Sequence, residues 1–113
     1  MNRRDLVRRL LAAVAATGLL PRTQGQAASS VSHEVEIKDF AFVPARLNVA
    51  LGDKVTWINA DVVPHTATAS DESWDSGSVQ QGERQTLVIS QGMTGAYYCR
   101  HHPSMKAELV IGT

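Results

Sequence analysis

Short alternating segments, separated by turn residues, fill the chain beyond residue 30 and constrain its fold more than any other feature. In residues 31–37, the side chains of Val31, His33, Val35 and Ile37 fall on one face. A period of two residues is typical of a half-buried strand, and no segment beyond residue 30 keeps a helical period. The sequence therefore predicts an all-β fold, a β-sandwich of seven or eight short strands.

Turn residues set the expected limits of these strands. Gly52-Asp53 joins two of them as a hairpin or a tight corner, and Pro44 marks an edge or a bend. Trp57 is expected to be a core aromatic residue. The expected extended segments are 31–37, 40–44, 47–51, 54–59, 66–69, 84–90, 96–99 and 106–111.

The first 27 residues are interpreted as a leader rather than as part of the domain. Four arginines among the first nine residues precede the apolar run from Leu10 to Leu20. That run is shorter than the roughly 20 residues that span a bilayer, but it is typical of a signal peptide. The pair Arg3-Arg4 resembles a twin-arginine export signal, and an ordinary secretory signal is the alternative. We expect cleavage to leave residues 28–113 in the periplasm, without stable membrane insertion.

Export changes the charge balance of the chain. Residues 1–27 hold five arginines and one aspartate, so six Lys/Arg remain against ten Asp/Glu, a formal net charge of −4. A nucleic-acid-binding surface needs a basic patch, and nucleic acid is therefore excluded as a partner. A domain of this length buries only a modest core, so a bound metal would add useful stability.

Cys99 is the only cysteine of the chain, which rules out an internal disulfide. In an exported protein, such a thiol is a buried apolar residue, a dimerising or reactive thiol, or a metal ligand. An exposed free thiol is a liability in an oxidising compartment. This consideration favours the metal ligand.

The segment that begins at Cys99 carries further soft or borderline ligands in the spacing Cys-x-x-His-x-x-Met. Two histidines, one cysteine and a weak axial methionine form the blue-copper set of ligands. The loop between two expected strands can bring Cys99, His102 and Met105 to one point. His65 lies just past the strand 54–59, where it can supply the second imidazole at the same end of the sandwich.

Other interpretations of these residues are weaker. Structural zinc sites favour cysteine-rich sets, and a thioether is a poor zinc ligand. A Cys–His hydrolytic nucleophile would leave Met105 and the second histidine without a role. His101 is expected to face solvent, because a Cys-x-His spacing would strain the turn, and His33 is expected to be peripheral.

Several segments of the chain resemble the cupredoxins, in particular the plastocyanin and amicyanin-like group. The two-residue gap between His102 and Met105 is similar to that of amicyanins, whereas plastocyanins have a longer gap. In one departure, Met93 stands where the family usually has glycine, and Gly95 where it usually has tyrosine. The resemblance covers about Val35 to Ile111, and its strongest segments are Val55–Asn59, Pro64–Thr66, Asp75–Gly77 and Tyr98–Met105.

The resemblance implies a cupredoxin-like Greek-key β-sandwich that holds one type 1 copper ion per chain. It also implies that Asn59 braces the ligand loops and that the backbone N–H of Thr66 donates to the sulfur of Cys99. The implied ligands are equatorial His65, Cys99 and His102, and axial Met105.

Together these features predict an exported, monomeric blue-copper protein that shuttles single electrons. It is not expected to be an enzyme, because four side chains fill the copper site and leave no position for a substrate. The resemblance implies that redox protein partners, a donor dehydrogenase and an acceptor cytochrome, oxidase or reductase, dock transiently around His102. Val63, Pro64 and Pro103 would complete that face. The alternative is a copper-binding or delivery protein that holds copper without redox cycling.

Overall fold

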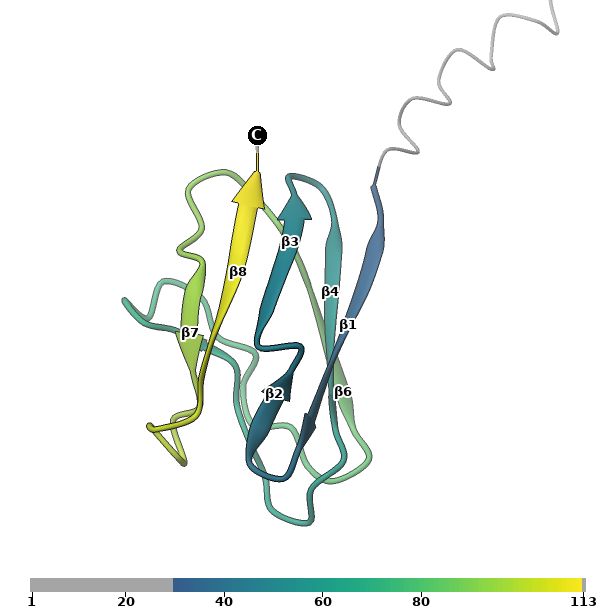
Figure 1. Cartoon of the computed structure of the whole chain (residues 1–113), viewed down its shortest axis with the longest axis vertical. Helices are drawn as coiled ribbons and strands as arrows, with labels where there is room; N and C mark the ends of the chain where they lie inside the picture. Colours follow the sequence, from purple (N-terminus) through teal and green to yellow (C-terminus); the bar gives the residue numbers. More distant parts are fainter. Residues whose placement is uncertain (1–29, 113) are drawn as a thin grey trace, which may run out of the picture.

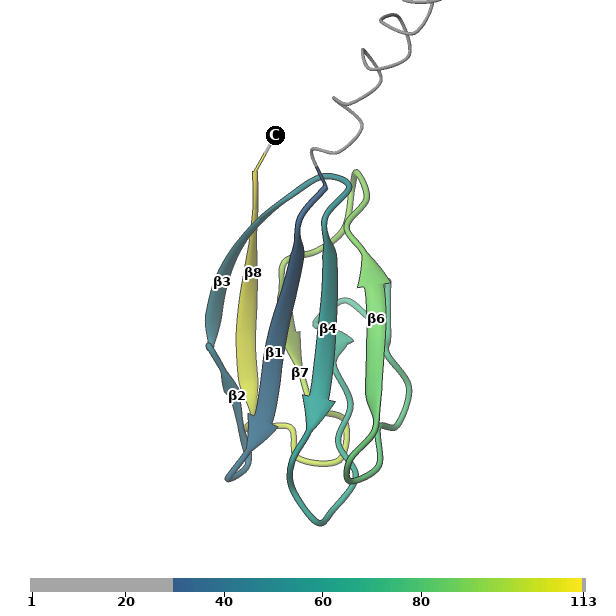
Figure 2. The same cartoon turned by 90° about the vertical axis from the view of Figure 1, so that its right-hand side faces the viewer.

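The computed structural model describes residues 30–112, which form eight strands in two facing sheets (Figures 1 and 2). This confirms the predicted all-β sandwich of seven or eight strands. Within the described residues there is no helix that could cross a membrane, and the predicted leader, residues 1–27, lies outside them. The strands are β1 (Ser32–Lys38), β2 (Ala41–Val43), β3 (Arg46–Ala50), β4 (Lys54–Asn59), β5 (Thr68–Ala69), β6 (Arg84–Val88), β7 (Ala96–Tyr98) and β8 (Lys106–Gly112).

Each sheet combines strands that are distant in the sequence. One sheet has the order β2-β1-β4-β6 and the other β3-β8-β7-β5. β1 pairs with β4 in parallel and β3 pairs with β8 in parallel, while the other pairs are antiparallel. β1, β4 and β7 all run toward the same end of the sandwich, the lower end in Figures 1 and 2.

Two predicted turn positions lie where the chain changes sheet. β2 and β3 belong to different sheets, and Pro44 lies in the bend between them. β3 and β4 also belong to different sheets, so Gly52, with φ of 90°, forms the tight corner rather than the hairpin. The buried Asp53 carboxylate fixes this corner, because it accepts hydrogen bonds from the backbone N–H groups of Ala50 and Val31 at 2.9 and 3.0 Å.

The core between the sheets contains a group of aromatic side chains. Trp57 is fully buried, as predicted, and its indole N–H donates to the hydroxyl of Tyr97 at 3.3 Å. The half-buried Trp74 packs against both rings, with centroids 5.8 and 5.7 Å away. Burial disfavours the charged phenolate and raises the pKa of Tyr97 to about 12. This apolar layer continues to Cys99, at the end of β7.

Candidate metal centre

Three connections meet at the lower end of the sandwich in Figures 1 and 2. They are the turn between β1 and β2, the segment 60–67 that follows β4, and the loop 99–105 between β7 and β8. The strand directions described above place all three at one end. The predicted ligands His65 and Cys99 therefore come together from opposite sheets.

His65 is fully buried, and both of its ring nitrogens have partners. Its backbone exchanges two hydrogen bonds with Val79, which fixes the chain at this residue. Nε2 lies 2.8 Å from a carboxylate oxygen of Asp61, and Nδ1 lies 3.6 Å from the sulfur of Cys99. An ionised carboxylate can only accept a hydrogen bond, so Nε2 carries the proton. The lone pair of Nδ1 is thereby directed at the thiol.

Cys99 is also fully buried, and a second group faces its sulfur. The backbone N–H of Thr66 donates to this sulfur at 3.4 Å, the contact that the resemblance implied. The hydroxyl of Thr66 in turn accepts the backbone N–H of Arg100 at 2.8 Å. These two bonds hold the segment of His65 against that of Cys99. A hydrogen bond to the sulfur also stabilises the thiolate, which is the form that binds metal.

The loop 99–105 is closed by its own backbone. Cys99 donates its N–H to the carbonyl of Met105 at 3.1 Å, and Met105 donates to His102 at 2.8 Å. His102 donates to the carbonyl of Cys99 at 3.2 Å. The three predicted ligands of this loop therefore form a compact turn. Met105 is buried under it, while His102 remains half-buried at the surface.

The His102 imidazole lies beside that of His65, with ring centroids 5.1 Å apart. Phe40, in the turn between β1 and β2, contacts both rings edge-on, with centroids 5.4 Å from His65 and 4.8 Å from His102. The sequence analysis missed this role of Phe40, because an apolar residue directly before a strand was taken as part of the strand. The available signal for a turn was the preceding Asp39, between the two extended segments.

Asp61 is the second residue that sequence reasoning missed. Besides His65, its carboxylate accepts the backbone N–H groups of Asp39 and Phe40 at 2.7 and 3.0 Å. Partial burial raises the pKa of Asp61, but the hydrogen bonds from Phe40, His65 and Asp39 outweigh it, so the pKa lies below its ordinary value. The only sequence signal was a carboxylate four residues before a predicted ligand.

Asn59 braces the segment that leads to His65, as the resemblance implied. Its side chain is fully buried at the end of β4. The amide NH₂ donates to the carbonyls of Val63 and Val79, both at 2.8 Å, and the amide oxygen accepts the backbone N–H of Asp61 at 2.8 Å. All polar groups of this buried side chain are therefore used, two of the bonds within the loop 60–64 and one to the segment that pairs with His65.

The donor set and its spacing fit a soft or borderline metal ion. An ion about 2.0–2.3 Å from each ligand, at a roughly tetrahedral angle, would hold a nitrogen and a sulfur about 3.5 Å apart. Nδ1 of His65 and the sulfur of Cys99 lie at 3.6 Å. Among residues 30–112, however, no three His, Cys, Asp or Glu side chains are gathered as a metal-binding group. Only His65 and Cys99 lie at ligand spacing, while His102 lies beside them and Met105 lies beneath the loop.

The two histidines that were not predicted as ligands, His101 and His33, lie away from Cys99, as the sequence predicted. His101 is exposed, and its ring nitrogen lies 3.0 Å from the hydroxyl of Ser78. His33 is at the opposite end of β1, where Nε2 lies 2.8 Å from the Asp53 carboxylate. Neither imidazole faces Cys99.

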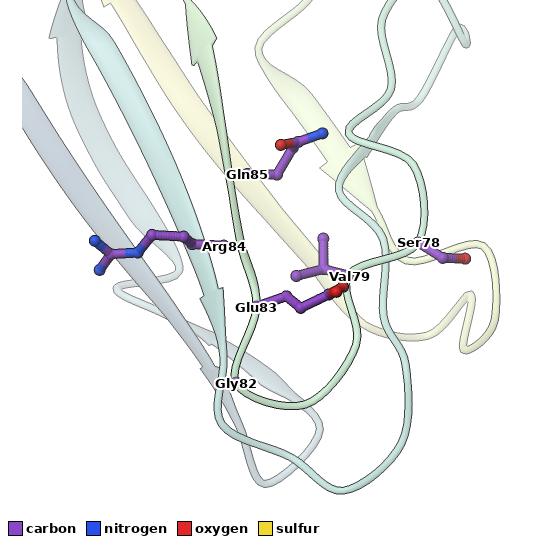
Figure 3. A pocket seen from close by; sticks show the side chains of 6 residues that line it. All are labelled: Ser78, Val79, Gly82, Glu83, Arg84 and Gln85. Atoms are coloured by element: carbon purple, nitrogen blue, oxygen red, sulfur yellow. The ribbon is translucent and has the colours of Figure 1, made fainter.

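A pocket of about 400 Å³ opens beside the start of β6 and contains none of the predicted ligands. Figure 3 shows that the side chain of Arg84 extends away from it and that Gly82 contributes only backbone. The pocket thus offers no soft ligand for a metal. Its lining residues are Ser78, Val79, Gly82, Glu83, Arg84 and Gln85.

The fold agrees with comparisons of this chain with known proteins. Residues 10–111 match the profile of the family described as the cupredoxin-like domain. The chain belongs to this family, which confirms the predicted cupredoxin fold.

Within the family, the chain is similar to amicyanins. It is 31% identical to the amicyanin of Paracoccus denitrificans over 116 residues, covering 90% of this chain and 88% of the relative. It is 25% identical to the amicyanin-alpha of Methylorubrum extorquens over 104 residues, covering 88% and 86%. A solved Cu(I) form of an amicyanin mutant superposes with a TM-score of 0.64 at 25% identity, covering 76% of this chain and 89% of that one. The predicted amicyanin-like group is confirmed.

Proposed function

We propose that this chain is a type 1 blue-copper protein that carries single electrons and binds one copper ion through His65, Cys99, His102 and Met105. The observation that carries the proposal is the pairing of Nδ1 of His65 with the sulfur of Cys99 at 3.6 Å. Membership of the cupredoxin family supports it, and the amicyanin structures include Cu(I) forms.

Each of the four side chains has a distinct part. Cys99 supplies the thiolate, and the Thr66 N–H moderates the charge of its sulfur. The imidazoles of His65 and His102 would be the two nitrogen ligands, and the buried thioether of Met105 would be a weaker fourth ligand. When bound, copper supplies the one-electron couple. Because side chains fill every position, no site is left for a substrate, and the protein is a carrier rather than an enzyme.

Partners dock, in this proposal, at the apolar end around His102. Val62 is 78% exposed and Phe40 is 50% exposed, and both belong to connections at this end of the sandwich. The exposed Pro103 follows His102 directly. A small apolar surface over a half-buried ligand suits weak, transient redox encounters. The partners are redox proteins, a donor dehydrogenase and an acceptor cytochrome, oxidase or reductase, and the carrier acts as a monomer.

Voltammetry of the copper-loaded protein tests electron transfer against copper delivery. A carrier should give a reversible one-electron couple and keep its copper in the presence of a Cu(I) chelator. His102→Ala should abolish that couple or shift its potential, whereas the matched variant His101→Ala should leave it unchanged. Rapid loss of Cu(I) to the chelator from the wild-type protein, without a reversible couple, would identify a delivery protein instead.

We further propose that residues 1–27 are a cleaved signal peptide and that residues 28–113 are the periplasmic cupredoxin domain. The support is the arginine-rich start followed by an apolar run too short to span a bilayer. Replacing Arg3-Arg4 with Lys-Lys should block export if the twin-arginine route is used. Normal periplasmic accumulation of this variant would point to the general secretory route, and the mass of the exported protein would give the cleavage site.

A further inference from the structure

The turn between β1 and β2 has an unusual backbone for its sequence. Its two central residues, Asp39 and Phe40, have φ of 54° and 58°, and Lys38 pairs with Ala41 across it. Two consecutive left-handed residues form the tight hairpin turn for which glycine and asparagine are preferred. Aspartate tolerates this conformation, but a bulky aromatic residue rarely adopts it. Glycine at position 40 would form the same turn without strain.

Asp61 holds this strained turn from the neighbouring loop. Its carboxylate accepts the backbone N–H groups of both left-handed residues, Asp39 at 2.7 Å and Phe40 at 3.0 Å. The oxygen that accepts from Phe40 also lies 2.8 Å from Nε2 of His65. One carboxylate therefore fixes both the turn and an imidazole. It ties the position of Phe40 directly to that of His65.

The Phe40 side chain makes its aromatic contacts with the two predicted imidazole ligands. Its ring is nearly perpendicular to both, at 88° to His65 and 79° to His102. Edge-to-face geometry is the favourable one for aromatic pairs. His65 is already fixed by Asp61 and by its backbone, whereas His102 is half-buried on a short loop. The ring of Phe40 thus links the fixed imidazole to the freer one.

We propose that Phe40 is a positioning residue, which Asp61 holds in a left-handed turn so that its ring orients the His102 imidazole against the fixed imidazole of His65. In this turn the ring contacts both imidazoles, which gives the strained conformation of Phe40 a role. This inference rests on the proposed copper site. Its consequence is that Phe40 limits the movement of His102 when the oxidation state changes, which keeps electron transfer fast.

The test compares Phe40→Gly with Asp39→Gly. Both variants relieve a left-handed residue of the same turn, but only the first removes the ring. A second pair, Phe40→Tyr and Phe40→Leu, asks whether an aromatic edge is needed or only bulk. In each copper-loaded variant, we would measure the electron self-exchange rate, the Cu(II) spectrum by electron paramagnetic resonance, and the reduction potential. In each metal-free variant, NMR would report the tautomer and ring mobility of the two imidazoles.

Phe40→Gly should bind one copper ion but exchange electrons about tenfold more slowly, the lower end of the loss expected when a group that orients a ligand is removed. Its Cu(II) spectrum should show more than one species, and the metal-free His102 ring should become mobile. Asp39→Gly and Phe40→Tyr should have the exchange rate, Cu(II) spectrum and ring mobility of the wild type. The exchange rate of Phe40→Leu should lie between those of Phe40→Gly and the wild type. Equal rates, spectra and ring mobility in Phe40→Gly and wild type would overturn the proposal.

The two proposals fail in different ways. If the wild type bound no copper, the proposed function would fail, while the NMR comparison of the metal-free variants would still decide the role of Phe40. If wild type and Phe40→Gly were equally good copper proteins, with equally ordered imidazoles, only the role of Phe40 would be lost.

Discussion

Asn59→Ala should destabilise the metal-free protein more than any exposed polar substitution, because the Asn59 side chain makes three hydrogen bonds in a fully buried position. Two join its NH₂ to the carbonyls of Val63 and Val79, and one joins its oxygen to the backbone N–H of Asp61, all at 2.8 Å. A net contribution of about 0.5–1.5 kcal/mol for each bond gives a loss of about 3 kcal/mol in the free energy of unfolding.

A loss of this size is readily measured. For a domain of this length, about 3 kcal/mol corresponds to a fall in Tm of roughly 12–24 °C. Urea denaturation should show a lower midpoint with an unchanged slope, since the native fold is retained. The backbone N–H of Asp61 should also exchange with solvent faster, because it loses its acceptor. The matched control is Asn48→Ala, which replaces an exposed asparagine of β3. The free energy of unfolding of this variant should stay within about 0.5 kcal/mol of the wild-type value.

A loss below about 1 kcal/mol for Asn59→Ala, or equal losses for the two variants, would refute this reasoning. It would mean that the loop 60–64 keeps its shape without the buried amide. In that case the position of His65 would have to come from its backbone pairing with Val79 and from the contact of its ring with Asp61.

Three further predictions follow from other parts of the chain. Gly95→Ala should lower the free energy of unfolding by about 2–3 kcal/mol in a urea titration, because the new Cβ would collide with the carbonyl of Leu109. The hydrogen bond from the hydroxyl of Thr94 is the main cause that lowers the pKa of Asp71 from 3.8 to about 2. The contribution of this carboxylate to the free energy of unfolding is therefore present above pH 3.8 and is lost as the pH falls through 2. Asp71→Asn should therefore remove this part of the acid dependence in pH-dependent denaturation. Met105→Leu should leave a coloured copper protein whose reduction potential, measured by voltammetry, is higher by about 59 mV or more, a tenfold change in a one-electron equilibrium.

The sequence predicted the longer strands well, because they carry their own periodicity. Val35 and Ile37 are fully buried, as their alternation requires. Val31 shares that face but is 52% exposed, since it precedes the first residue of β1. Periodicity predicts the face of the strand on which a residue lies, but not whether the opposite sheet extends far enough to cover it. For the same reason, Gly52-Asp53 could be identified as a turn but not as a change of sheet.

The departure from the family pattern before Cys99 has a physical explanation in the structure. Gly95 passes so close to the carbonyl of Leu109 that a Cβ does not fit, and the two residues share a 2.8 Å backbone hydrogen bond. Met93 packs half-buried against the core, and its sulfur accepts the backbone N–H of Ser90 at 3.1 Å. The sequence could not predict the approach of Gly95 to Leu109 or the packing of Met93 on the core, because both depend on segments that meet only in the folded protein.

The roles of Phe40 and Asp61 had no comparable sequence signal. Ligand residues are rare side chains with recognisable spacing, so Cys99, His102 and Met105 could be named as candidates in advance. A phenylalanine and an aspartate are common, and their importance lies in a turn conformation and in hydrogen bonds to two segments. Residues that hold a site together in this way become visible only in three dimensions.

The visible absorption spectrum of the copper-loaded protein tests the central claim most directly. If Cys99 binds Cu(II) beside His65, charge transfer from its thiolate should give an intense visible band and a blue protein. Cys99→Ser should abolish that band, because an alkoxide is a far harder ligand than a thiolate. An intense band that survived in Cys99→Ser, or a wild-type protein that bound Cu(II) without one, would contradict the account.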